Sequence, residues 1–153
     1  MLDSLAEVSV TLAGFAAVFR AFAIGNDPDG HSAVRLNVVI EGGLLLAFIS
    51  FLPGVLLGAS LAEDAAYRVS GGIGGIWALL RAIPGIQIIR GGWPLPALFP
   101  LAYAFFLVAL FSFIFGALDI RPLGAIAAHQ AGCVALFGSM AITFVAQFRV
   151  ERA

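Results

Sequence analysis

Four ionisable residues stand inside or beside the first two apolar segments of the chain: Glu7, Arg20, Arg35 and Glu41. A charged side chain at the centre of a membrane helix costs roughly 2.5–3.5 kcal/mol on insertion scales, so it needs an opposite charge, water or a functional role. Carboxylates in such places bind cations or protons, and arginines pair with them. We therefore place the candidate chemistry in the first forty-odd residues.

The sequence favours an ion pair between Arg20 and Glu41. Arg20 lies over a turn from the end of the first segment, and Glu41 lies about two turns beyond Arg35 in the second. An antiparallel hairpin would bring the pair to similar depths, where Asn37 and Arg35 would join it in lining or gating an ion pathway. The alternative is a pair that only fixes the register of two helices.

A second group of polar residues is predicted toward the opposite, outer end, where Glu7, Thr11 and His129 form a possible polar site. His129 and Cys133 are four residues apart and share a helix face, but two ligands do not make a metal site. A histidine hydrogen-bonded beside Gln130 is the simpler interpretation. We expect no bound metal and no cofactor, and the single cysteine excludes an intrachain disulfide.

Glycines mark the predicted helix contacts. Gly71 and Gly75 have the GxxxG spacing that lets helix backbones approach closely, and Gly14 and Gly132 lie on stripes of small residues. The glycine-rich run around Gly71 is not a phosphate loop, because no Gly-Lys-Ser/Thr follows it. Trp77 and Arg81 are spaced for a cation–π contact. The aromatic run 97–118 is expected to face lipid.

Composition sets the medium. The 153 residues are 61% hydrophobic and 11% charged, against roughly 45–50% and 25% in soluble domains. Such a chain has too little polar surface to face water, so the lipid bilayer is its expected partner. A net charge of −1 gives no electrostatic case for nucleic acid.

The predicted fold is all-α: one domain over residues 1–153, a polytopic transmembrane bundle of about five helices. Membrane crossing takes about 20 helical residues. The apolar runs of that length are 4–25, 35–60, 66–89, 97–118 and 123–148. Pro84-Gly85 leaves two possibilities for 84–96: a kinked end of the third helix, or an interfacial piece after a helix that ends near Ile83.

Arginine counting predicts the orientation. The ends near 25–34 and 84–96 and the C-terminus gather six arginines, whereas the opposite side has Arg68 and Arg121. The positive-inside rule then puts the N-terminus outside and the C-terminus in the cytoplasm.

A weak resemblance follows from short apolar motifs. Residues 14–19 (GFAAVF), Leu52-Pro53 and the ending 146–149 (AQFR) resemble small, uncharacterised bacterial integral membrane proteins. The resemblance implies a five-helix protein of the bacterial inner membrane and brings no activity or site residues.

Two functions remain open. The first is a homo-oligomeric channel, or pathway for ions or small solutes, with its polar face on the first two helices. The second is a non-catalytic accessory or assembly subunit of a larger membrane complex. The sequence contains no HExxH, GxSxG or clustered His/Cys motif, so we do not expect an enzyme.

Overall fold

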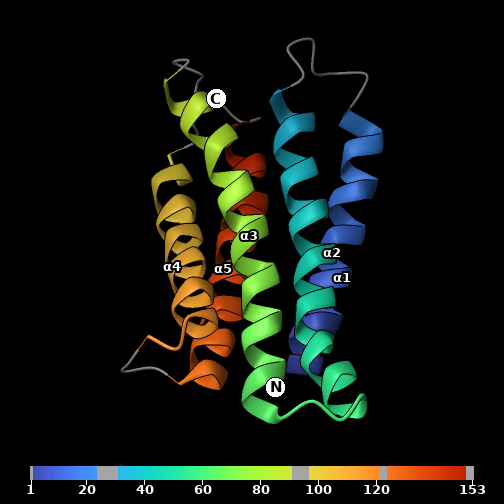
Figure 1. Cartoon of the computed structure of the whole chain (residues 1–153). Helices are drawn as coiled ribbons and strands as arrows, with labels where there is room; N and C mark the ends of the chain where they lie inside the picture. Colours follow the sequence, from blue (N-terminus) through green and yellow to red (C-terminus); the bar gives the residue numbers. More distant parts are fainter. Residues whose placement is uncertain (1, 24–30, 91–96, 121–123, 151–153) are drawn as a thin grey trace.

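Five helices run side by side along the length of the molecule (Figure 1). In this computed structural model, residues 2–23, 31–90, 97–120 and 124–150 are described. The helices are α1 (Leu2–Ala23), α2 (His31–Gly58), α3 (Glu63–Arg90), α4 (Phe99–Ala117) and α5 (Ala125–Val150). The prediction of an all-α protein with five helices is confirmed.

Four of the helices are long and apolar enough to cross a membrane. Their candidate spans in the described residues are Asp3–Ala21, Leu36–Gly58, Phe99–Ala117 and Ala125–Ala146. The remaining predicted span, 66–89, lies within α3, a continuous helix of 28 residues that extends to Arg90 and is not among the candidate spans of the described residues. The alternative in which the third helix ends near Ile83 is therefore wrong. Residues 91–96 lie outside the described part of the chain.

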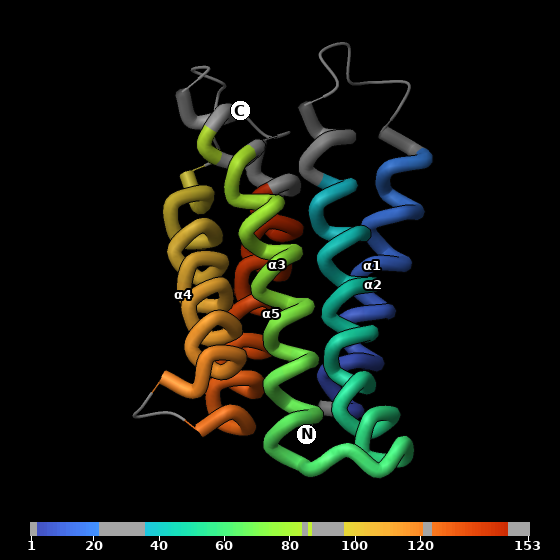
Figure 2. The backbone as a smooth tube through the Cα atoms, in the orientation of Figure 1, coloured from blue at the N-terminus to red at the C-terminus, as the bar shows by residue number. Residues whose placement is uncertain are grey.

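The helices form an up-and-down bundle in which α5 contacts all four others. Figure 2 shows α1 and α2 on one side, α4 and α5 on the other, and α3 between them at the front. A short connection joins α4 to α5, and the two helices run antiparallel. α1 contacts α2 and α5, so most of its surface faces away from the bundle.

Close backbone approach joins α1 to α2. A Cβ added at Gly43 would lie 2.8 Å from the Ser9 carbonyl oxygen and 2.9 Å from the Ala13 Cβ. Ser9, Ala13 and Ala16 are buried on this side of α1. Helices with such small-residue faces associate through van der Waals packing, which does not need water as the surrounding medium.

Phe113 fills the centre of the α3–α4–α5 contact. Its side chain is fully buried, and Cβ atoms added at Gly74 or Gly132 would approach its ring to 3.2 Å and 2.6 Å. Gly71 and Gly75 face the same stretch of α4, with added Cβ atoms 3.3 Å from the Phe113 carbonyl oxygen and 3.5 Å from Ile114. One large ring of α4 thus fits into space that glycines on α3 and α5 leave open.

The aromatic residues of α4 divide between core and surface. Phe105, Phe111 and Phe115 are exposed, as expected for a helix that faces lipid, but Phe113 is buried. The expectation that this run faces lipid is therefore too broad, because one side of α4 packs against α3 and α5.

Hydroxyl side chains within the helices bond to their own backbone. Ser9 donates to the Leu5 carbonyl at 2.6 Å, Ser70 to the Ala66 carbonyl at 2.9 Å, and Thr143 to the Ser139 carbonyl at 2.8 Å. These bonds satisfy the hydroxyl donors without solvent, as an apolar environment requires.

We expect Gly43→Ala to destabilise the protein by about 1–3 kcal/mol, because the added methyl group would push Ser9 and Ala13 of α1 away from α2. Thermal melting in detergent measures the effect. Gly14→Ala is the matched control: nothing lies within 4 Å of an added Cβ there, and alanine favours the helix. Equal melting temperatures for the two variants would contradict the close α1–α2 contact.

Phe113→Ala should cost about 3–5 kcal/mol in chemical unfolding, since it leaves a cavity between three helices. Phe111, two residues earlier on the same helix, is 52% exposed and provides the control. Phe111→Ala is expected to change stability by less than about 1 kcal/mol. A comparable loss in both variants would mean that the ring of Phe113 does not anchor the bundle.

Candidate functional site

The carboxylate of Glu41 on α2 forms a salt bridge with the guanidinium of Arg81 on α3. The sequence-based preference was Arg20, and the structure gives Glu41 a different partner. Arg81 also lies over the ring of Trp77, 5.8 Å from its centroid, as the i, i+4 spacing predicts. The cation is therefore held by an aromatic face on its own helix and by a carboxylate on the neighbouring one.

Helix register explains why Arg20 is not the partner. Gly43 packs against Ser9 and Ala13, so Glu41 lies level with the stretch of α1 around Ala13. Arg20 is seven residues further along α1, a distance of about 10 Å at 1.5 Å per residue. Among the described side chains, the Nε of Arg20 is buried without a hydrogen-bond partner.

The Glu41–Arg81 pair lies well inside the length of its helices. Glu41 is ten residues from His31, or about 15 Å, and Arg81 is nine residues from Arg90, or about 14 Å. Glu41 is five residues inside the candidate span Leu36–Gly58, which is about 8 Å. A membrane crossed by α2 would therefore place Glu41 in the hydrocarbon region, which is about 30 Å thick, whereas α3, which carries Arg81, is not among the candidate spans.

The same pair is not enclosed by the chain. The Arg81 side chain is 42% exposed and that of Glu41 is 45% exposed. On α2 the face that carries Glu41 continues through Leu44 and Phe48, both more than half exposed. The polar face predicted for the second helix exists, but it points out of the bundle rather than into it.

The other residues of the predicted gating group lie nearer the end of the hairpin. Asn37 is half-buried, one turn before Glu41 on α2, and Arg20 is half-buried near the end of α1. The backbone of Arg35 belongs to the second turn of α2, but its side chain lies outside the described residues. The structure thus keeps these residues in one half of the molecule without bringing them into one contact.

The outer face of α1 is also polar and uncovered. Glu7 and Thr11 are exposed on it, with the Thr11 hydroxyl donating to the Glu7 carbonyl at 2.9 Å. Gly14, predicted as a packing residue, lies on the same face with nothing within 4 Å of an added Cβ. At Gly14 this face of α1 therefore has no other helix of the described chain packed against it.

His129 does not join Glu7 and Thr11 in a shared site. Its side chain is fully buried, with its ring centroid 5.4 Å from that of Tyr67 and 5.9 Å from that of Phe113. Its Nε2 lies 3.6 Å from the Cys133 Sγ. The predicted outer polar site fails for a geometric reason: His129 faces the core, whereas Glu7 faces away from it.

No cluster of three or more His, Cys, Asp or Glu side chains that could hold a metal occurs in the described ranges.

Arg68 forms salt bridges with Asp64 at 2.6 Å and with Asp119 at 2.8 Å. This link joins the start of α3 to the connection after α4, where Asp119 adopts a positive φ of 55°. These salt bridges connect elements at one end of the bundle, and the partners of Arg68 are Asp64 and Asp119 rather than Glu7.

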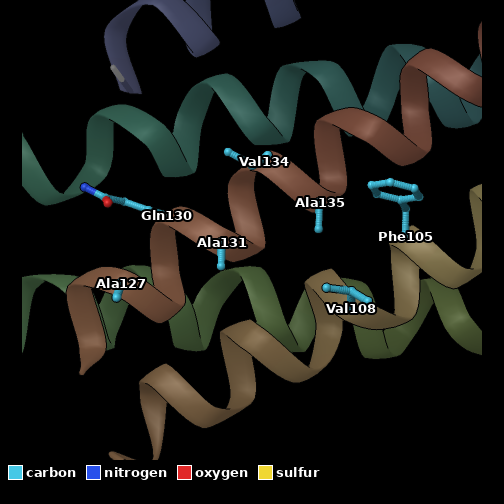
Figure 3. Close-up of a pocket in the computed structure, with 7 residues that line it drawn as sticks. All are labelled: Phe105, Val108, Ala127, Gln130, Ala131, Val134 and Ala135. Carbon is cyan, nitrogen blue, oxygen red and sulfur yellow. The ribbon is translucent and has the colours of Figure 1, made fainter. Parts of the chain in front are cut away.

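A shallow cleft of about 450 Å³ lies between α4 and α5 (Figure 3). Gln130 is the one polar residue among its lining residues, which are Phe105, Val108, Ala127, Gln130, Ala131, Val134 and Ala135. Val108 and Val134 are about half exposed, so the cleft opens at the surface of the bundle. Apart from Gln130 its walls are apolar, so the cleft suits a hydrocarbon chain rather than an ion.

Comparison with family models, curated proteins and solved structures finds no match to this chain. Its candidate site therefore stands on geometry and electrostatics alone.

Sequence reasoning missed Arg81 as the partner of Glu41. The available signal was its position: Arg81 and Glu41 are nearly equally far from the helix ends that meet at one side of the bundle. That signal is usable only when the third helix is known to continue through Pro84 to Arg90. A helix that ended near Ile83 would have put Arg81 in its last turn rather than nine residues before the helix end.

A double-mutant cycle tests the partner of Glu41. We expect Glu41→Gln and Arg81→Gln to couple by about 0.5–2 kcal/mol in unfolding free energy, because each removes the same salt bridge. Glu41→Gln combined with Arg20→Gln should be additive within about 0.5 kcal/mol. Coupling in the second cycle and additivity in the first would restore Arg20 as the partner.

Proposed function

We propose that the chain is a multi-pass integral membrane protein that forms an ion pathway between copies of itself. In this proposal Glu41 is the cation or proton site and Arg81 is its counter-ion. The observation that carries the proposal is the half-exposed carboxylate of Glu41, some 8 Å inside a candidate membrane span and paired with the guanidinium of Arg81 on α3. Ionisable residues at such depth mark ion pathways, relays or protein contacts.

The location of the pair argues for a pathway between subunits. Glu41 lies on an outward-facing surface, so a path that uses it would be closed by a neighbouring molecule. The cleft between α4 and α5 is apolar and is not a candidate for that path. Asn37, one turn from Glu41, would supply a second polar side chain along the same helix.

The proposed setting is the bacterial inner membrane, with the N-terminus outside and the C-terminus in the cytoplasm. Arg20, Arg35 and Arg90 lie near helix ends on the side where α1 joins α2, whereas Arg68 lies near the opposite end. This bias supports a cytoplasmic location for the arginine-rich end. There Arg20 and Arg35 would set the electrostatic potential at the mouth of the pathway.

The outer face of α1 supports a second candidate, an accessory subunit that packs against a larger membrane complex. Glu7, Thr11 and Gly14 are uncovered on that face, and a small-residue stripe with a polar group suits contact with another helix. Mild purification from native membranes separates the two candidates. A pathway of identical subunits purifies alone, whereas an accessory subunit brings a stoichiometric partner.

Ion flux into proteoliposomes tests the pathway. We expect the wild type to pass H⁺, Na⁺ or K⁺, and Glu41→Gln to reduce that flux roughly tenfold or more, because a neutral amide does not replace the carboxylate. Glu63→Gln is the control, since Glu63 is an exposed acid in the first turn of α3. Absence of flux in the wild type, or equal flux in all three, would end the proposal.

A further inference from the structure

The exposed ion pair requires a cover that the single chain does not provide. Both side chains are more than two-fifths exposed, and each charge in hydrocarbon costs roughly 2.5–3.5 kcal/mol on insertion scales. Pairing removes the net charge but leaves the polar atoms facing acyl chains. A protein surface placed over this pair would remove that contact with lipid.

The charges also restrict which surface can cover them. Subunits related by an axis along the membrane normal keep the same depth, so residues meet partners at their own level in the bilayer. In a twofold contact, the pairing is reciprocal. If a first residue of one copy touches a second residue of the other copy, then the second residue of the one copy also touches the first residue of the other. A patch with one acid and one base at the same depth is therefore complementary to itself.

We propose that the α2–α3 face binds the same face of a second copy around a twofold axis along the membrane normal. Glu41 of each copy then meets Arg81 of the other, and four alternating charges close the contact. This inference rests on the membrane placement proposed above and does not require ion conduction.

The surroundings of the pair fit such a contact. Large apolar side chains flank it on both helices at similar depth: Leu44 and Phe48 on α2, and Ile76 and Leu80 on α3, are 54–64% exposed. In such an interface the charges at the centre fix how the two copies are oriented. The apolar side chains around them supply the buried contact area.

The outer face of α1 is a weaker candidate for self-association. Its exposed ionisable groups at the start of the span, Asp3 and Glu7, are both acids, so a twofold contact there would bring like charges together at one depth. Arg68, which lies in the same half of the molecule, is already shared by Asp64 and Asp119. The sign of the charges therefore favours the α2–α3 face.

Cysteine crosslinking in membranes tests the face. In a Cys133→Ala background, Phe48→Cys or Leu80→Cys should give a crosslinked species of twice the 15.9 kDa of one chain. Val108→Cys on α4 is the matched control, because Val108 is 55% exposed, close to Phe48 at 54%. Thr11→Cys reports contact through α1. Crosslinks at Val108 or Thr11 without crosslinks at Phe48 and Leu80 would overturn the proposal.

Charge exchange tests the role of the pair. Glu41→Arg should abolish the crosslink at Phe48→Cys, and Glu41→Arg with Arg81→Glu should restore it, because the exchanged patch is again complementary to itself. Melting temperatures show whether each variant folds. If Glu41→Arg does not fold, the crosslinks of the variants that keep Glu41 and Arg81 decide whether the α2–α3 face is the interface. Undiminished crosslinking in Glu41→Arg, or a monomer by mass in nanodiscs, would contradict the proposal.

The outcomes separate this inference from the proposed pathway. A dimer through α2–α3 without ion flux keeps the interface and ends the pathway. Ion flux from an assembly that crosslinks through another face keeps a pathway and ends this interface.

Discussion

In the membrane placement proposed above, the cost of placing charge in hydrocarbon is the constraint on which the rest of this structure depends. Glu41 and Arg81 come from different helices and meet at a level where neither has an alternative charged partner among the described side chains. Their salt bridge fixes α2 against α3 at one height, and the Trp77 ring supports the cation from the same helix. Bundle register and the candidate function thus share one interaction.

Close packing supplies the rest of the bundle. Glycine and alanine let α1 approach α2, and Phe113 fills the space left by glycines on α3 and α5. Both contacts gain van der Waals energy without relying on the release of water, which suits helices that lipid surrounds. The hydroxyls of Ser9, Ser70 and Thr143 bond within their own helices and so do not need solvent as an acceptor.

The distribution of polarity distinguishes the inside from the outside of this molecule. His129 and Cys133 are buried in the core and contact each other, whereas Glu7, Glu41 and Arg81 lie on outward faces. A single soluble domain would place charges on its surface because water solvates them. In the membrane placement proposed above, charges on the surface of the bundle instead favour contact with another protein, and this unites the proposed pathway and the proposed interface.

The sequence by itself determined the helical class, the number of helices and their approximate ends, because long apolar runs punctuated by Gly, Pro and Asp leave few alternatives. Helical periodicity also determined which residues share a face, such as Glu41 with Phe48. Only the tertiary structure decided that this face points outward, that His129 points inward and that Glu41 pairs with Arg81. Periodicity carries no information about which helix lies opposite a face. The relative depth of two residues depends on where their helices end and on helix register. Here the packing of Gly43 and the continuation of α3 through Pro84 decide both.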